Sequence, residues 1–264
     1  MPTSFFDALW DDYIQLSPRA VAIRDLFGGK AVRNDHVAFR TFAYPSIAIA
    51  DLEVFLFAMG YQRHSVYQFT DKHLSACSYT PSSNIDPLIF LSELHIDQLP
   101  FEAGQIVLRL LSRLDAPPQD ESVFYSGRLW PLLSWPDYQI LSASSEYAAW
   151  LALHGFHANH FTIALHSINR SLPAVVAHLR SLAFPLNEVG GVIKGQPSDL
   201  LIQAATMAEQ QEVCFADGER HFVPTCYYEF AERFTQADGS LFQGFVASNA
   251  NKIFESTDQR VARE

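Results

Sequence analysis

Two segments of this chain decide the expected fold: DHVAFRTF at residues 35–42 and NHFTIAL at residues 159–165. Each places a histidine, His36 or His160, at the start of a run with strand-like alternation. Successive side chains of a strand point to opposite faces, so every second residue after each histidine shares its face. The two histidines therefore look like the same position in two copies of one module.

The sequence around each histidine predicts the same order of elements. Residues 30–99 predict a first β-α-β-β-β module, whose helix runs from about 49 to 59 and stops at Gly60. Residues 154–236 predict a second β-α-β-β-β module, with a helix over about 172–184. We expect an α+β fold in which both modules form a curved, barrel-like mixed sheet around a metal site.

The segments outside the modules predict added helices. Residues 100–153 show helix-period apolar positions interrupted by prolines, which indicates a helical connector or lid. An amphipathic start predicts an N-terminal packing helix, and residues 237–264 form a C-terminal segment. A length of 264 residues with 48% hydrophobic residues suits a single compact domain over 1–264.

Composition narrows the class of protein. The net charge of −11, from 18 basic and 29 acidic residues, argues against a nucleic-acid partner, because phosphate tracking needs clustered Lys and Arg. Three isolated cysteines, Cys77, Cys214 and Cys226, suggest neither a disulfide framework nor a cysteine zinc site. An acidic N-terminus and the lack of a long apolar run lead us to expect a cytoplasmic protein with no membrane partner. The sequence also lacks nucleotide-binding and serine-hydrolase motifs.

A carboxylate in a third strand-like run completes a candidate metal site. Glu229 lies in CYYEFAERF at residues 226–234, where an unpaired carboxylate between aromatic residues would be costly. With His36 and His160 it gives two histidines and one carboxylate, the ligand set of non-haem Fe(II) oxygenases. Glu232 competes for the carboxylate role, and either histidine could instead be an ordinary half-buried residue bonded to a carbonyl.

Other polar residues are candidates for the same site. His154 and His157 lie close to His160 in sequence, but Gly155 argues against a helix that would align them, so both are expected in a loop. Arg40 shares the strand face of His36 and could hold a substrate carboxylate with its planar fork. The alternative for Arg40 is a structural ion pair with a buried acid. Lys194 and Gln203 are weaker candidates for substrate contacts.

Several segments resemble motifs of one known family, the 2-oxoadipate dioxygenase/decarboxylases, which are related to the vicinal oxygen chelate fold. They are DHVAFRTF, FLSEL (90–94), NHFT (159–162), IKG (193–195), YEFAER (228–233), Gly244-Phe245 and IFEST (253–257). The resemblance covers most of the chain. It implies that His36, His160 and Glu229 bind Fe(II) and that Arg40 contacts the substrate.

The resemblance also implies a reaction. Members convert 2-oxoadipate and O2 to 2-hydroxyglutarate and CO2, so the expected partners are a small 2-oxo acid and O2. Two alternatives stay open at this point. One is a redox-neutral, metal-dependent lyase, isomerase or hydrolase of the vicinal oxygen chelate type, and the other is a non-catalytic protein that binds a small carboxylate.

Overall fold

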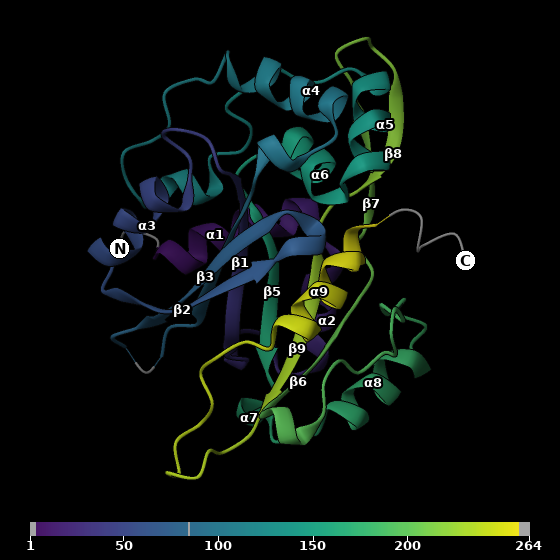
Figure 1. Cartoon of the computed structure of the whole chain (residues 1–264). Helices are drawn as coiled ribbons and strands as arrows, with labels where there is room; N and C mark the ends of the chain where they lie inside the picture. The colour runs from purple at the N-terminus through teal and green to yellow at the C-terminus, as the bar shows by residue number, and fades with distance from the viewer. Residues whose placement is uncertain (1–3, 84, 259–264) are drawn as a thin grey trace.

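Seven strands form one curved, half-barrel mixed sheet in the computed structural model, which describes residues 4–83 and 85–258 (Figure 1). Its spatial order is β2-β3-β4-β1-β5-β9-β6. The strands are β1 (Asn34–Phe42), β2 (Tyr61–Phe69), β3 (Leu74–Pro81), β4 (Leu88–Leu94), β5 (Ala158–Ala164), β6 (Leu201–Ala205) and β9 (Tyr227–Arg233). The expected α+β fold with a curved mixed sheet is confirmed.

The two modules meet where their histidine-bearing strands pair. β1 runs antiparallel to β5, while β1 pairs in parallel with β4 and β5 pairs in parallel with β9. Ala38 lies opposite His160 in this central pairing. Strands that are far apart in the sequence thus bring the two histidine segments side by side, as the repeated pattern predicts.

The second module departs from the predicted order within the sheet. β7 (Gln210–Cys214) and β8 (Arg220–Pro224) pair only with each other, as a hairpin inserted between β6 and β9. The strand that would match β2 is reduced to a single bridge between Lys194 and Gln203. Residues of β7 alternate between exposed and half-buried, so this hairpin has a strand pattern without a face to bury in the main sheet.

Helices occur both within the two modules and in the connector between them. The module helices are α3 (Ile49–Ala58) and α8 (Leu172–Ser181), with a short α7 (Leu165–Ile168) between β5 and α8. The connector contains α4 (Phe101–Leu111), α5 (Trp135–Ser144) and α6 (Glu146–His154). The apolar pattern over 138–153 is divided between α5 and α6 because Ser145 ends the first helix, and its side chain accepts a hydrogen bond from the Ala148 N–H at the start of the second.

The two faces of the sheet have different covers. On the convex face, α1 (Phe5–Leu16) packs against β5, and the Trp10 ring lies 5.2 Å from that of Phe161. α2 (Arg19–Leu26) follows, and the Phe27 ring at its C-terminal end lies 5.8 Å from that of Phe230 on β9. On the concave face lie α9 (Ala247–Ile253) and the 3-10 turn η6 (Phe254–Thr257), and α9 crosses in front of the strands in Figure 1. Since His160 alternates with Phe161, the histidines face the concave side.

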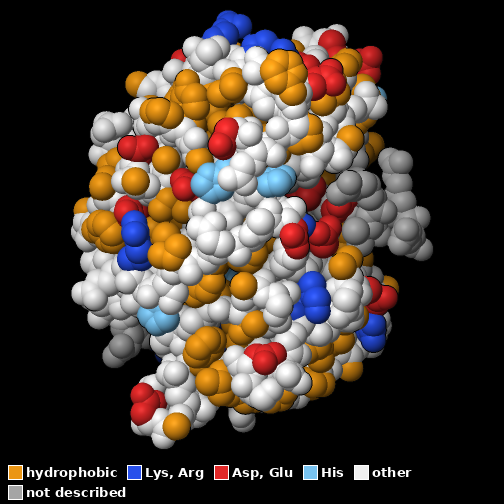
Figure 2. All heavy atoms as spheres, viewed as in Figure 1, with side chains coloured by type: hydrophobic (Ala, Val, Ile, Leu, Met, Phe, Trp, Pro, Cys, Tyr) orange, Lys and Arg blue, Asp and Glu red, His pale blue; other side chains and the backbone are white. Residues whose placement is uncertain are grey.

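Basic side chains do not gather into one large patch on the face shown in Figure 2. On the face shown in Figure 2, Lys and Arg side chains stand in small separate groups among acidic and hydrophobic ones. No helix within the described ranges is both long and apolar enough to cross a membrane.

Candidate metal centre

Three buried side chains from three strands converge on the concave face. His36 of β1, His160 of β5 and Glu229 of β9 each offer one ligand atom, and these atoms lie within 4.8 Å of one another. Glu229 Oε1 is 3.5 Å from His36 Nε2, and its Oε2 is 3.2 Å from His160 Nε2. All three residues are at most 5% exposed. The structure therefore brings together the three residues that the sequence predicted as metal ligands.

Irregular strand pairing sets the direction in which the side chains of His36 and His160 point. The β1–β5 register shifts between Asn34 and Val37, next to His36, and again opposite the Ala158–His160 segment. Such bulges let two neighbouring residues point to the same side of a strand. Each histidine consequently contacts the polar residue just before it, which regular alternation would place on the opposite face.

These preceding residues fix the orientation of the two imidazole rings. Asp35 Oδ1 lies 2.8 Å from His36 Nδ1, and Asn159 Oδ1 lies 3.2 Å from His160 Nδ1. An acceptor at Nδ1 keeps the proton there and leaves an unprotonated Nε2 that can bind a metal. At His36 this nitrogen now accepts a hydrogen bond from the Thr162 hydroxyl at 3.1 Å, which a bound metal would replace. The Glu229 carboxylate is held by Gln203, whose amide donates to Glu229 Oε1 at 2.6 Å.

Electrostatics keep this set in metal-binding form. Burial would raise the pKa of Glu229, but His36, His160 and the Gln203 hydrogen bond outweigh it and hold that pKa below its ordinary value. Burial lowers the pKa of His160 more than Glu229 raises it. At neutral pH the site thus offers a carboxylate and a neutral His160. Glu229 Oε2 has no hydrogen-bond partner among the described residues, which suits an atom meant for a cation.

The cover over the cluster leaves little room. A cavity of about 20 Å³ borders the three residues, and its other walls include Phe245, Ile253 and Phe254 from the C-terminal segment. A single water needs roughly 10–15 Å³, so the cavity has space for an ion or about one water. A ligand larger than one water can therefore enter only if the cover shifts.

Comparison with known proteins places the chain in a family. Residues 121–239 match a family model described as 2-oxoadipate dioxygenase/decarboxylase. The 2-oxoadipate dioxygenase/decarboxylase of Oryza sativa subsp. japonica, a chloroplastic/amyloplastic protein, is 32% identical over 274 residues, which cover 93% of this chain and 75% of the relative. The chain belongs to this family. The resemblance inferred from the sequence motifs is confirmed.

Solved structures agree with that assignment. The crystal structure of the hydroxyglutarate synthase from Oryza sativa in complex with 2-oxoadipate matches with a TM-score of 0.90 and 31% identity, covering 99% of this chain and 95% of that one. A glyoxalase superfamily structure from Ralstonia eutropha JMP134 matches at a TM-score of 0.77 with 19% identity, over 93% of this chain and 85% of that one. The fold of this 2-oxoadipate dioxygenase/decarboxylase family member is thus of the glyoxalase, or vicinal oxygen chelate, type.

Arg40 lies beside the cluster in a buried ion pair. Its Nη1 is 3.0 Å from Glu146 Oε2, and its Nη2 donates to Thr257 Oγ1 at 3.0 Å. The guanidinium also stacks over Tyr147 and Trp150, at 4.7 and 5.2 Å from their ring centres. Here Arg40 adopts the structural ion pair that the sequence left open as an alternative, and its substrate contact stays a prediction.

The two weaker candidates differ in their distance from the cluster. Gln203 borders the cavity, and its Oε1 has no hydrogen-bond partner among the described residues. Lys194 Nζ instead donates to the carbonyl and side-chain oxygens of Asn187, at 2.8 and 3.2 Å, and is not among the residues that border the cavity. Because Lys194 pairs with Gln203 through backbone hydrogen bonds, it helps to hold the strand on which Gln203 lies.

His154 and His157, which precede His160 in the sequence, form hydrogen bonds with other residues. The expected loop position is wrong for His154, which is the last residue of α6 because the helix continues up to Gly155; its Nε2 donates to the Pro224 carbonyl at 2.9 Å. His157 Nδ1 lies 2.7 Å from Asp12 Oδ2. Neither belongs to the cluster of His36, His160 and Glu229 that could hold a metal among the described residues.

His154 should make stability depend on pH. Burial lowers its pKa to about 3, whereas an unfolded histidine titrates near 6.5. Between these values the unfolded chain binds the extra proton, so the stability contributed by neutral His154 is complete above pH 6.5 and falls by about 1.4 kcal/mol per unit below it. Urea unfolding between pH 7 and 4 should show a smaller decline in His154→Gln than in wild type; equal slopes would refute the effect.

The sequence did not predict roles for Asp35, Asn159, Arg233 or the aromatic cover. Asp35 and Asn159 were visible as the residue before each histidine, and this repeated pairing of a side-chain acceptor with histidine was the available signal. Arg233 and Asp35 are 198 positions apart in the sequence, so no local pattern predicts their contact. The aromatic cover from the C-terminal segment appeared only as motifs without a role.

Proposed function

We propose that this chain is an Fe(II)-dependent dioxygenase/decarboxylase that converts 2-oxoadipate and O2 to 2-hydroxyglutarate and CO2. The observation that carries the proposal is the convergence of His36, His160 and Glu229 in a chain of this family. Two imidazoles and a carboxylate on one side of an ion leave positions open for substrate and O2. The 2-oxoadipate in the rice hydroxyglutarate synthase structure supports the choice of substrate.

The residues fit an iron ion. His36 and His160 would bind through Nε2 and Glu229 through the carboxylate oxygen that lacks a hydrogen-bond partner among the described residues. When bound, Fe(II) would supply the electrons and the open coordination positions that O2 activation requires. The charge of one carboxylate leaves the ion a net positive charge, which favours an anionic 2-oxo acid.

The chain's own groups would orient and enclose the substrate. The 2-oxo acid end belongs at the three-residue cluster, beside the amide oxygen of Gln203. Arg40 would take the distant carboxylate once that group replaces Glu146 or joins it. Phe245 and Phe254 close the site with apolar surface, which keeps water from reactive species during turnover.

Anaerobic Fe(II) reconstitution followed by O2 and CO2 measurements tests the proposal. Wild type should consume O2 and release CO2 with 2-oxoadipate, and His160→Ala should lose at least about 100-fold, since even residues that only support metal ligands cost about 10–100-fold. His64→Ala on β2 is the matched control, because that histidine is exposed and outside the cluster.

Two outcomes would contradict the proposal. Metal binding without O2 uptake across a panel of 2-oxo acids would favour redox-neutral lyase, isomerase or hydrolase chemistry on the same fold. Absence of metal binding would remove the catalytic role and favour a carboxylate-binding protein.

A further inference from the structure

We infer that Arg233 is a positioning residue for the metal centre, holding Asp35 against His36 on one side and the turn that carries Phe245 on the other. The inference rests on the proposed metal-binding function and goes beyond it, because Arg233 is neither one of the three ligand residues nor a wall of their cavity. Four hydrogen bonds and one ring contact of this single guanidinium carry the argument.

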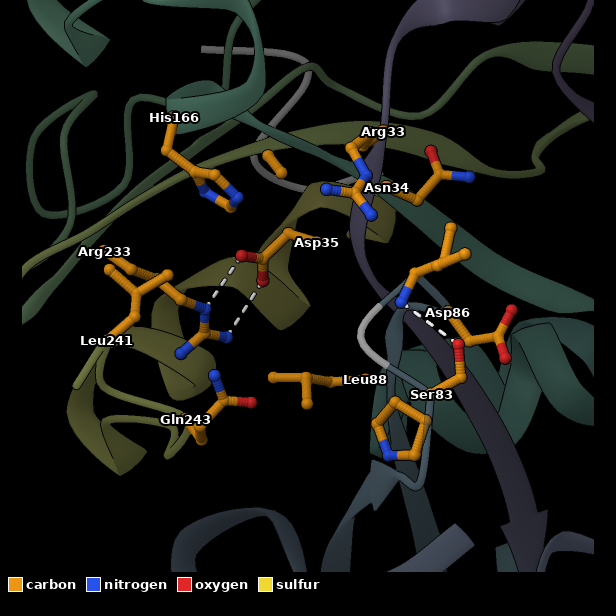
Figure 3. A pocket seen from close by; sticks show the side chains of 13 residues that line it. Arg33, Asn34, Asp35, Ser83, Asp86, Leu88, His166, Arg233, Leu241 and Gln243 are labelled. Carbon is orange, nitrogen blue, oxygen red and sulfur yellow. Dashed lines mark hydrogen bonds and ion pairs between the residues drawn. The ribbon is translucent and has the colours of Figure 1, made fainter. Parts of the chain in front are cut away.

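The first link is a two-point ion pair between Arg233 and Asp35. Arg233 Nε lies 2.8 Å from Asp35 Oδ2, and its Nη2 lies 2.9 Å from Oδ1. Figure 3 shows the guanidinium and the carboxylate facing each other across these two contacts. Both residues are at most 7% exposed. The planar fork fixes the carboxylate in one orientation, which a single-point contact could not do.

The second link runs from Asp35 to a metal ligand. Asp35 Oδ1 accepts the Nδ1 proton of His36, so the orientation of the carboxylate sets the tautomer and the direction of His36 Nε2. The other histidine has a weaker support: Asn159 is neutral, its contact is longer, and its Nδ2 has no hydrogen-bond partner within the described part of the chain. The charged, clamped support is therefore specific to His36.

The third link joins Arg233 to the cover of the site. Its Nη1 donates to the carbonyls of Phe242 and Gly244, at 3.1 and 2.7 Å. The guanidinium carbon lies 5.1 Å from the ring centre of Phe245, which packs edge-on against His36 at 4.8 Å. The same side chain thus fixes the backbone turn that brings Phe245 over the cavity.

A pocket on the far side of the ion pair makes the role testable. A space of about 290 Å³ borders Arg233 and Asp35, and exposed residues such as Arg33, His166 and Gln243 line its rim. Figure 3 shows Arg33 and His166 on opposite sides of the Asp35 carboxylate. If the Arg233 side chain is shortened, a small cation from solution can reach Asp35 through this pocket.

The experiment measures Co(II) affinity from its visible absorption, in the full chain and without turnover. Arg233→Ala should bind Co(II) about 10–100-fold more weakly than wild type, and millimolar guanidinium should restore most of the loss. Urea, which has a similar shape without charge, should restore none. Arg180→Ala is the matched control, because Arg180 forms an exposed ion pair with Glu188 away from the cluster and should bind Co(II) as wild type does.

Further variants keep the test decisive if the Arg233→Ala protein does not fold because Asp35 is left buried without its partner. Arg233→Lys keeps the positive charge, but a lysine side chain cannot contact both Asp35 oxygens and both carbonyls at once. The Co(II) affinity of this variant should therefore lie between those of wild type and Arg233→Ala. Asp35→Asn should also weaken Co(II) binding, and guanidinium should not rescue it.

The outcomes separate this inference from the proposed function. Folded Arg233→Lys and Asp35→Asn proteins that bind Co(II) within about twofold of wild type, well short of the roughly tenfold minimum expected, would overturn the positioning role and leave the metal site intact. A wild-type chain that bound no metal would overturn both.

Discussion

Replacing Glu229 with glutamine should abolish metal binding and turnover while leaving the metal-free protein folded. Glutamine keeps the size of the side chain and can still meet Gln203, but its neutral amide is a poor ligand for a divalent cation. The variant also removes a buried charge, and the relief of its desolvation offsets the loss of the carboxylate's contacts with His36 and His160. Stability without metal should change little.

Thermal unfolding with and without metal measures this effect. A ligand at 100 times its dissociation constant stabilises a protein by about 2.7 kcal/mol, which corresponds to roughly 5–10 °C for a chain of this size. Wild type should show that rise with Fe(II) under anaerobic conditions, or with Co(II), and Glu229→Gln should show none.

Glu232→Gln provides the matched control for this prediction. Glu232 lies on the same strand, but its carboxylate accepts a hydrogen bond from the Leu172 N–H at 2.6 Å, at the start of α8. Its loss should lower stability by about 1 kcal/mol, as for other helix caps, and leave the metal-dependent rise unchanged. A rise that persists in Glu229→Gln and disappears in Glu232→Gln would mean that the wrong carboxylate has been assigned.

The convergence of His36, His160 and Glu229 could be predicted because local patterns carry it. Strand alternation gives the face on which each histidine lies, and the repeated module places β1 beside β5. Glu229 was recognisable because a charge between aromatic residues in a strand needs a partner. Except for the comparison of the two modules, these inferences use only residues within a few positions of one another.

The rest of the centre depends on contacts that no local pattern encodes. Arg40 could be assigned to a strand face, but its partner Glu146 comes from the first turn of α6 in the connector, 106 positions away. The β7–β8 hairpin had a readable strand pattern, yet sheet membership depends on which partner edge is free. The cover from Phe245 and Phe254 likewise follows from the path of the C-terminal segment over the sheet.

Replacing Arg40 with alanine should separate substrate recognition from metal binding. The variant should bind Co(II) as tightly as wild type, since Arg40 hydrogen-bonds to Glu146 and Thr257 and to none of the three ligand residues. Its kcat/KM for 2-oxoadipate should fall about 100-fold, because a charged two-point contact with a carboxylate is worth roughly 3 kcal/mol. With 2-oxohexanoate, which lacks the distant carboxylate, wild type and variant should differ little.

Stability must be separated from recognition in this experiment, because Arg40→Ala leaves Glu146 buried without its partner. Breaking one side of a buried ion pair costs about 3–5 kcal/mol, so the single variant should also melt earlier. The double variant Arg40→Met with Glu146→Gln removes both charges and should recover most of that stability, yet it should still fail to distinguish 2-oxoadipate from 2-oxohexanoate. If the double variant regained full preference for the dicarboxylic acid, Arg40 would be only a structural partner of Glu146, and the distant carboxylate would have to be bound by another group.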